Sequence, residues 1–422
     1  MSVFEELKAR GFIYQSTHDQ ELVEHLKQPR VFYVGFDPTA DSLHVGSLVP
    51  IMAMVNLQRA GHIPLALVGG GTARVGDPSG KTEARQMLDS DRIEANEAGV
   101  AAQLAKYASL DGEKGFLLNN KDWLMGIGYI DFLREIGTHF SINRMLTAES
   151  VKQRLETGLS FLEFNYMLLQ AYDYYVLARD RKCSLQIGGQ DQWGNIVAGG
   201  DLCRRMGIEQ QTYGLTFPLI TNSTGAKFGK SVSGNVWLDP KRTSPFDFYQ
   251  FWRNSEDVDV ARYLKLFTLL PLEEIDRLSN PEGNINRAKE ILAYEVTCIT
   301  HGRQEANRAF ATAITKFGAA DPKCSVQTSS QITNVSVTDN VDMPRLDVPA
   351  TELAELNWVK LLVRAELAKS NGEARRLIKG RGARAGDGVI ENGEEALSSQ
   401  HFPDGKLILR AGKKRFKLIT LT

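Results

Sequence analysis

The chain has 422 residues, of which 42% are hydrophobic and 24% charged, and its formal net charge at pH 7 is −1. This length exceeds what one hydrophobic core usually organises, so we expect two or three domains with the composition of a globular protein. No apolar run is long enough to span a bilayer, and the charged first residues lack the apolar core of a signal peptide. We therefore expect a cytoplasmic protein without a membrane partner.

The four cysteines, Cys183, Cys203, Cys298 and Cys324, form no C-x-x-C pair, so we expect neither a disulfide framework nor a zinc site. The near-neutral net charge hides an asymmetry along the chain. From Trp358 to the end there are 14 Lys and Arg against 7 Asp and Glu, a net charge of +7, whereas the preceding part carries −8. A basic terminal segment on an acidic body suggests a polyanionic partner, nucleic acid first.

An apolar strand is predicted at Val31–Phe36, and residues 33–47 (YVGFDPTADSLHVGS) lead from it through a turn into a helix whose apolar residues recur at core-facing spacing. A strand that feeds a helix through a Gly-containing turn presents free backbone N–H groups and the positive end of the helix dipole, which together bind phosphate. His44 and Ser47 add neutral donors, and Gly46 leaves room for a nucleotide near the backbone. On this stretch alone, an ordinary strand–helix unit in which His44 only caps the helix explains the pattern equally well.

The next strand is predicted at Ile63–Val68, a continuous apolar run typical of a buried parallel strand, followed by the Gly-rich GGGTARVGDPSGK. Asp77 in this run follows the carboxyl end of the strand, where open α/β sheets bind ligands, and its carboxylate can hold an amino group. A structural Asp that stabilises the turn is slightly favoured for Asp77 taken alone. Lys81 and Arg85 follow in a polar segment.

A helix predicted within residues 161–180 carries Tyr166, Gln170 and Asp173 at i, i+4 and i+7. Polar groups inside an apolar helix cost stability unless they are paired. A buried network between helices would satisfy them. A polar stripe in an apolar wall is also how pockets for small ligands are built.

Two further predicted strands end in polar residues: 116–118 runs towards Asn120, and 185–187 runs into GGQDQWGN with Asp191 and Gln192. Repeated junctions of strand, Gly-rich turn and helix predict a doubly wound parallel sheet that binds a nucleotide.

The sequence KFGKS places Lys227, Lys230 and Ser231 in a loop rich in Gly and Ser. A flexible loop with two ammonium groups can close over a polyphosphate and stabilise the charge of a transition state. The signal is weak by itself because surface loops are often lysine-rich, and the spacing is not that of a P-loop.

Behind this loop, residues 241–320 are predicted to be helical, 321–350 a linker, and 351–422 a small α+β domain that ends in a hairpin. The basic end of its helix at 373–379 is either a solvated face or an RNA-binding surface, and the clustering of charge favours RNA.

The segments HVGS, GDPSGK, GGQDQWGN and KFGKS occur in this order. The set resembles the signature motifs of class I aminoacyl-tRNA synthetases, and the sequences of the segments resemble those of bacterial-type tyrosyl-tRNA synthetases. The resemblance covers essentially the whole chain. It implies a Rossmann-like doubly wound catalytic domain at 1–240, an α-helical anticodon-side domain at 241–320, a linker at 321–350 and an S4-like RNA-binding domain at 351–422.

The resemblance also implies the reaction. The enzyme would activate L-tyrosine with ATP to tyrosyl-adenylate and pyrophosphate, with Mg²⁺ on the phosphates and no metal held by the protein. It would then transfer the tyrosyl group to the 3′-terminal adenosine of tRNA(Tyr). A homodimer is implied as well, with 128–165 as the candidate interface.

Residue roles follow from the same resemblance, position by position. Tyr33 and Asp173 would contact the phenolic hydroxyl of tyrosine from opposite sides. The implied tyrosine site consists of Tyr33, Asp77, Asn120, Tyr166, Gln170, Asp173 and Gln192. The implied ATP site consists of Gly35, Asp37, Thr39, His44, Gly46, Ser47, Asp191, Gln192 and Lys230. The implied catalytic residues are His44, Ser47, Lys81, Arg85, Lys227, Lys230 and Ser231.

Two positions depart from the family pattern: Ser47 stands where His is most common, and Ala73 where Gly is common. A hydroxyl can still bond a ribose or a phosphate, so we expect function to persist. Three other functions compete with this one. A tryptophanyl-tRNA synthetase would not need the pair of Tyr33 and Asp173, a non-catalytic RNA-binding relative would not need His44 and the lysines, and a small-molecule nucleotidyltransferase would not need the basic tail.

Overall fold

The computed structural model describes residues 1–79, 88–155, 158–221, 228–231, 234–280, 282–337, 345–386, 388–412 and 415–422. Lys81, Arg85 and Lys227 lie outside these ranges, and for Lys230 and Ser231 only the backbone is described. The chain forms two compact units. The first comprises Met1–Ser244 with Asn254–Leu292, and the second Pro245–Arg253 with Ala293–Thr422. The helices predicted as one domain at 241–320 are therefore divided between the units.

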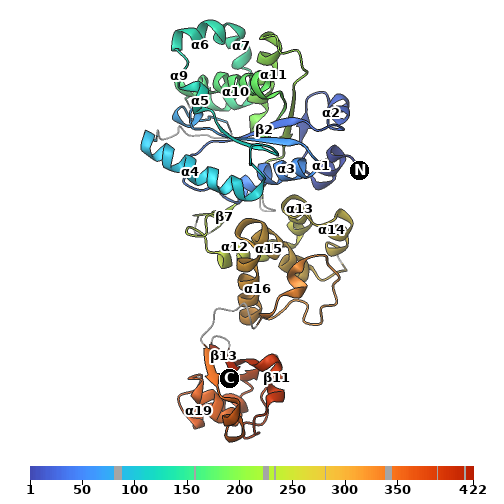
Figure 1. Cartoon of the computed structure of the whole chain (residues 1–422), viewed down its shortest axis with the longest axis vertical. Helices are drawn as coiled ribbons and strands as arrows, with labels where there is room; N and C mark the ends of the chain where they lie inside the picture. The colour runs from blue at the N-terminus through green and yellow to red at the C-terminus, as the bar shows by residue number, and fades with distance from the viewer. Residues whose placement is uncertain are drawn as a thin grey trace. The chain divides into compact units, whose positions relative to one another are not determined.

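The first unit is built on a six-stranded sheet in the order β1-β6-β5-β2-β3-β4 (Figure 1). Its strands are β1 Gln15–Ser16, β2 Val31–Phe36, β3 Ile63–Val68, β4 Phe116–Asn119, β5 Cys183–Gly189 and β6 Tyr213–Phe217. All neighbours from β6 to β4 pair in parallel, and only β1 is antiparallel. This is the strand order of doubly wound nucleotide-binding sheets, so the predicted fold class is confirmed.

Helices cover both faces of this sheet, with α3 and α4 on one face and α10 and α11 on the other (Figure 1). Their bounds are α3 Leu48–Arg59, α4 Ser90–Tyr107, α10 Tyr166–Arg181 and α11 Trp193–Arg205. Because neither face meets water, the central strands are apolar throughout instead of alternating. The strand order of the sheet reverses between β2 and β5. In open α/β sheets, ligands bind at the carboxyl ends of the strands beside such a reversal.

The remaining elements of the first unit surround this core. They are α1 Val3–Arg10, α2 Asp19–His25, α5 Lys121–Leu124, α6 Tyr129–Glu135, α7 Ile142–Met145, α8 Glu149–Leu155, α9 Phe161–Phe164, α13 Asp257–Phe267, α14 Leu272–Leu278 and the ribbon of β7 Lys230–Ser231 and β8 Gly234–Asn235. Buried Arg10 fixes the first helix in place, since its guanidinium donates to the carbonyl oxygens of Thr268 (3.2 Å) and Leu270 (3.0 Å) just behind α13. None of the helices in these described ranges has the length and apolarity that a membrane crossing requires.

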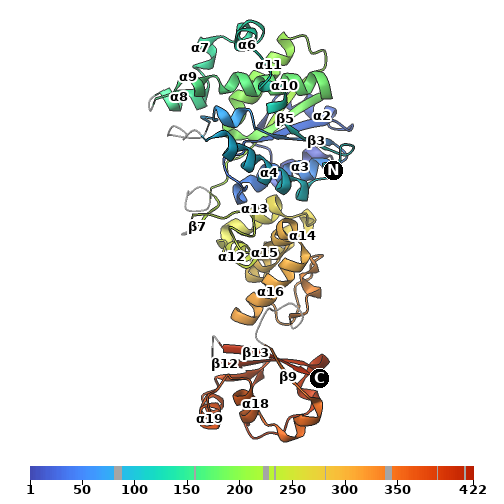
Figure 2. The ribbon, with the colours of Figure 1, turned by 60° about the vertical axis from the view of Figure 1, so that its left-hand side comes forward.

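The second unit contains α12 Pro245–Arg253, most of α15 Ile285–His301, α16 Arg303–Phe317 and a five-stranded sheet in the order β11-β10-β12-β13-β9. The strands are β9 Arg345–Val348, β10 Ala383–Ala385, β11 Gly388–Val389, β12 Lys406–Ala411 and β13 Arg415–Leu421. Helices α18 Trp358–Arg364 and α19 Asn371–Lys379 pack on one face of it (Figure 2).

One predicted boundary in this unit is wrong. The linker was predicted to extend to residue 350, yet β9 pairs in parallel with β13, and Val348 is fully buried in the core of the C-terminal sheet. A four-residue strand between two prolines is too short for its pattern to be recognised, and its partner lies about 70 residues further along the chain.

Candidate active site

A pocket of about 790 Å³ opens at the carboxyl ends of the central strands, where the sequence predicted the ligand site. It brings together all the predicted tyrosine- and ATP-binding residues whose side chains are described: Tyr33, Gly35, Asp37, Thr39, His44, Gly46, Ser47, Asp77, Asn120, Tyr166, Gln170, Asp173, Asp191 and Gln192. They come from the ends of β2, β3, β4 and β5 and from α10. The junctions read separately in the sequence therefore form one site.

At one end of the pocket, Tyr33 and Asp173 are almost completely buried, with 1% and 2% of their surfaces exposed. The carboxylate of Asp173 accepts hydrogen bonds from Asn120 Nδ2 (2.9 Å) and Trp123 Nε1 (2.7 Å). The hydroxyl of Tyr33 has no hydrogen-bond partner in the described part of the chain. A buried hydroxyl without a partner is costly, so this group indicates a ligand with a polar atom at this position.

Burial also sets the charge of these two groups. It raises the pKa of Asp173 to about 7, although the bonds from Asn120 and Trp123 oppose the shift. Burial, followed by the nearby charge of Asp173, raises the pKa of Tyr33 well above its ordinary value, so its phenol stays neutral. Asp173 can therefore change its protonation state when a hydrogen-bond donor arrives.

A second polar cluster surrounds Asp77. Its carboxylate accepts from Gln192 Nε2 (2.7 Å) and from the backbone N–H of Ser79 (2.9 Å). Asn195 Nδ2 in turn donates to Gln170 Oε1 (3.0 Å) and Gln192 Oε1 (3.2 Å). Burial raises the pKa of Asp77 to about 6, and the charge of Asp37 adds to the shift. No Lys, Arg or His of the described ranges forms an ion pair with Asp77, so the cluster suits an ammonium group supplied by a ligand.

Asp37 lies between these clusters. Its two carboxylate oxygens accept from Tyr166 OH (2.9 Å) and Thr72 Oγ1 (2.8 Å), and Thr72 Oγ1 also accepts from Asn120 Nδ2 (2.9 Å). A Cβ at Gly69 would collide with the carboxylate of Asp37, which explains a glycine at the end of β3. One hydrogen-bonded chain thus links the Asp173 end of the pocket to the end of β2.

The opposite end of the pocket carries the HVGS turn. His44 caps a 3₁₀ turn, Val45–Ser47, because its Nδ1 accepts from the backbone N–H of Gly46 (3.0 Å). Burial lowers the pKa of His44, so the ring is neutral and its Nε2 carries the proton. A Cβ at Gly46 would lie 2.7 Å from the His44 ring, so only glycine leaves the cap intact. The capping and ligand-binding interpretations of His44 are compatible, since Nε2 remains available.

The second motif packs against this turn. Gly229 of KFGKS has φ +90°, and a Cβ there would lie 2.8 Å from Val45 Cγ2. Val236, just behind the ribbon, donates its backbone N–H to the Gly229 carbonyl (3.0 Å) and accepts from Val45 N–H (3.0 Å). The backbones of the two motifs therefore form one wall of the pocket.

Sequence reasoning missed Thr72, Trp123 and Asn195, which hold the predicted residues in place. The only signal in the sequence is that each of them stands close to a predicted residue, as Trp123 stands close to Asn120. The departure at Ala73 is harmless to the backbone, because Ala73 lies in the 3₁₀ turn Thr72–Arg74, a conformation that alanine adopts without strain.

The family of the chain follows from its similarity to known proteins. The family model for class I tRNA synthetases (W and Y) matches residues 25–318. A tyrosine–tRNA ligase from Desulfosudis oleivorans is 51% identical over 432 residues, which cover 100% of this chain and 99% of that protein. One from Clostridium botulinum is 47% identical over 422 residues, with the same coverage.

Among solved structures, a C-terminally truncated mitochondrial tyrosyl-tRNA synthetase from Aspergillus nidulans is similar, with a TM-score of 0.67 and 32% identity. The similarity covers 75% of this chain and 94% of that one. The chain therefore belongs to the tyrosine–tRNA ligases, within the class I tRNA synthetases.

Proposed function

We propose that the pocket activates L-tyrosine with ATP, forming tyrosyl-adenylate and pyrophosphate, and that the tyrosyl group then passes to the 3′-terminal adenosine of tRNA(Tyr). The observation that carries the choice of amino acid is the buried hydroxyl of Tyr33, which has no hydrogen-bond partner among the described residues and lies near the charge of Asp173. A phenolic hydroxyl can accept from Tyr33 and donate to Asp173 at the same time. Phenylalanine would leave the Tyr33 hydroxyl without an acceptor and would offer no donor to Asp173, and an indole N–H cannot accept a hydrogen bond.

The Asp77 cluster would hold the α-ammonium group. A cation there pairs with a buried carboxylate, and Tyr166 and Gln170 point oxygen acceptors into the same pocket. The hydrogen bond from Asn120 would orient the carboxylate of Asp173, and that from Gln192 would orient the carboxylate of Asp77.

The carboxylate of bound tyrosine is already a nucleophile, so attack on the α-phosphate of ATP needs no base from the protein. It needs alignment, and stabilisation of the charge that grows on the phosphate and the departing pyrophosphate. Neutral His44 and the backbone amides of the HVGS turn would donate to this charge. Ser47, Lys227, Lys230 and Ser231 would be further donors, as the family resemblance implies. Gly35, Thr39 and Asp191 would line the nucleoside, and Lys81 and Arg85 would complete the phosphate site.

Mg²⁺ would arrive bound to the ATP phosphates, where it offsets part of their charge. The described ranges contain no cluster of three His, Cys, Asp or Glu side chains that suits a metal ion.

We also propose a homodimer. Large apolar side chains are exposed along the segment from α5 to α9: Met125 (61%), Tyr129 (61%), Ile130 (64%), Ile142 (64%) and Phe161 (71%). Exposed apolar groups that gather on neighbouring helices mark an interaction surface, and a second copy of the chain would cover them. The net positive charge of residues 358–422 suits tRNA as a partner. The cytoplasm is the location that we propose for the protein.

The assignment is tested by replacing Asp173 with Asn, which keeps the shape but removes the carboxylate that accepts from the substrate. We expect Asp173→Asn to weaken L-tyrosine binding at least tenfold by isothermal titration calorimetry, because a buried charge-assisted hydrogen bond is lost. Asp201→Asn is the matched control, since Asp201 on α11 pairs with Arg144 and Arg204 outside the pocket. Unchanged tyrosine binding in folded Asp173→Asn would contradict the assignment.

A further inference from the structure

The segment between β2 and the HVGS turn, residues 37–44, forms no helix or strand, yet it carries Asp37, Thr39 and His44 of the proposed ATP site. A loop of this kind keeps its shape only if its buried backbone groups find partners. We propose that Asn96 and Gln103 of α4 are positioning residues that hold this segment in its ATP-binding conformation. The inference rests on the proposed function, because it takes the segment to be part of the ATP site.

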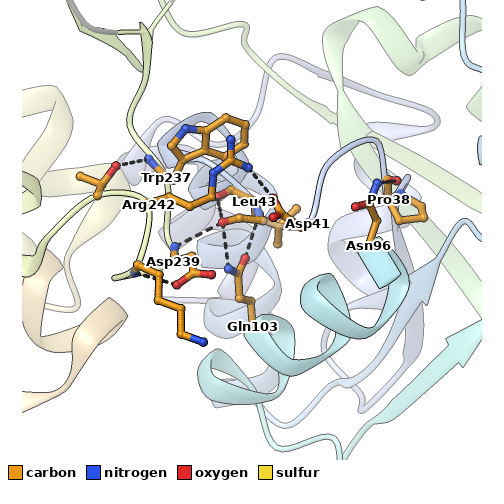
Figure 3. A network of polar contacts seen from close by, with 11 residues as sticks. Pro38, Asp41, Leu43, Asn96, Gln103, Trp237, Asp239 and Arg242 are labelled. Carbon is orange, nitrogen blue, oxygen red and sulfur yellow. Dashed lines mark hydrogen bonds and ion pairs between the residues drawn. The ribbon is translucent and has the colours of Figure 1, made fainter. Parts of the chain in front are cut away.

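Gln103 and Asn96 reach the backbone of the segment directly (Figure 3). Gln103 Oε1 accepts from the Leu43 N–H (2.8 Å), and Gln103 Nε2 donates to Ser42 Oγ (2.9 Å). Asn96 Nδ2 donates to the Pro38 carbonyl (3.0 Å). The two amides are seven residues apart, so they lie on the same face of α4 and bind both ends of the segment.

Both amides are buried, with 3% of Asn96 and 6% of Gln103 exposed, and neither lines the pocket. They therefore touch the segment and not a ligand. Between them, Gly99 lets the helix approach closely, since a Cβ there would collide with the carbonyl oxygen of Asp41. The contact depends on the amide side chains of Asn96 and Gln103 and on Gly99 between them. A helix that only covers the surface of a protein does not require this pattern.

The other side of the segment is held by residues behind the KFGKS ribbon. Ser42 Oγ accepts from the backbone N–H of Asp239 (3.2 Å), and the Leu43 carbonyl accepts from the N–H of Leu238 (2.9 Å). Arg242 forms an ion pair with Asp41 and stacks on the ring of Trp237, 3.5 Å from its centroid (Figure 3). The segment is thus fixed between α4 and the chain at 237–242.

Loss of the Gln103 amide would leave the Leu43 N–H buried without a partner, and the backbone would shift to reach water. Leu43 directly precedes His44, so such a shift moves the imidazole and the HVGS amides. Small displacements of aligned groups lower the rate of a positioned reaction steeply. The tyrosine-binding groups on α10 and behind β3 belong to other elements and meet the segment at Asp37, to which Tyr166 donates (2.9 Å), so the larger effect should fall on ATP.

The test is tyrosine-dependent ATP–pyrophosphate exchange with the full chain, comparing Gln103→Met and Asn96→Leu with the wild type. Both replacements keep the volume of the amide and remove its hydrogen bonds. We expect each to raise KM for ATP or lower kcat about tenfold, with KM for tyrosine within about twofold. If one variant does not fold, the other carries the test.

Gln58→Met is the matched control. Gln58 on α3 holds a loop in the same way, since it donates to the carbonyls of Ser109 (2.8 Å) and Lys114 (3.0 Å), and it does not line the pocket. It should leave the ATP parameters unchanged. Equal changes in the ATP and tyrosine parameters of Gln103→Met, or the same loss in Gln58→Met, would reduce both amides to general structural roles and overturn the proposal.

A further variant, His44→Asn, separates this inference from the proposed function. Weaker use of ATP by His44→Asn, together with normal use by Gln103→Met and Asn96→Leu, would overturn the positioning role alone. Normal use of ATP by His44→Asn would contradict the ATP site itself, and the positioning role with it.

Discussion

Tyr33 contributes a hydroxyl that lacks a partner in the described part of the free protein, while the neighbouring Tyr174 hydroxyl donates to the Tyr213 carbonyl (2.8 Å). The two rings are in edge contact, with centroids 5.4 Å apart. Two buried tyrosines side by side therefore serve different purposes. One completes the fold, and the other keeps an unsatisfied polar atom that a ligand satisfies.

Tyr33→Phe should stabilise the free protein by roughly 1 kcal/mol, because it removes a buried group without a partner. It should also lower the preference for tyrosine over phenylalanine roughly tenfold. Urea unfolding and competitive binding measure the two effects. Tyr174→Phe is the control, and it should lose stability while keeping the preference. A destabilised Tyr33→Phe with unchanged preference would show that the Tyr33 hydroxyl is structural.

The buried carboxyl groups of Asp173 and Asp77 make the stability of the free protein depend on pH. Asp173 and Asp77 have pKa values raised to about 7 and about 6, against an ordinary value of 3.8. Between about pH 4 and pH 7 the folded free protein binds more protons than the unfolded chain. The contribution of these groups to stability is therefore complete below about pH 4 and is lost as pH rises towards 7.

In the proposed site tyrosine binds when both carboxyl groups are ionised, so its affinity should change with pH in the opposite direction to stability. We expect it to fall as pH drops below 7, by up to tenfold per pH unit from Asp173, with protons released on binding near pH 6. Calorimetry in buffers of different ionisation enthalpy measures both quantities. An affinity that stays constant from pH 8 to pH 5 would contradict the ligand roles of these two carboxyl groups.

At the scale of elements, the sequence predicted what local patterns encode. The bounds of β2 and β3 were predicted correctly because both strands are continuous apolar runs, and the polar stripe of α10 reaches the pocket as its spacing required. Other features depend on distant partners. The strand β9 exists only through β13, and the contact of Gln103 with Leu43 joins residues 60 positions apart. No local pattern reveals such pairings.

The HVGS turn gives a prediction at this scale. In Gly46→Ala the new methyl group would meet the His44 ring, so the ring must turn and release the Gly46 N–H. We expect the rate of tyrosine activation to fall at least tenfold, with tyrosine binding unchanged. Pre-steady-state formation of the adenylate measures the rate. Gly126→Ala serves as control, since a Cβ at Gly126 meets nothing within 4 Å. A normal rate in Gly46→Ala would exclude a role for the capped His44.

At the scale of the whole molecule, chemistry and charge are separated along the chain. The pocket lies entirely in the first unit, whereas the net charge of +7 belongs to residues 358–422 in the second. Adenylate formation should therefore need only the first unit, and transfer to tRNA should need both. Charge counting along the sequence located the basic segment, because net charge does not depend on the fold.

The central claim is that the pocket selects tyrosine for adenylation. ATP–pyrophosphate exchange with each of the twenty amino acids in turn tests it most directly, with purified full-length protein and Mg²⁺. We predict exchange with tyrosine alone. Exchange with tryptophan would contradict the roles of Tyr33 and Asp173, and no exchange with any amino acid, from folded protein that still binds tRNA, would contradict the catalytic function itself.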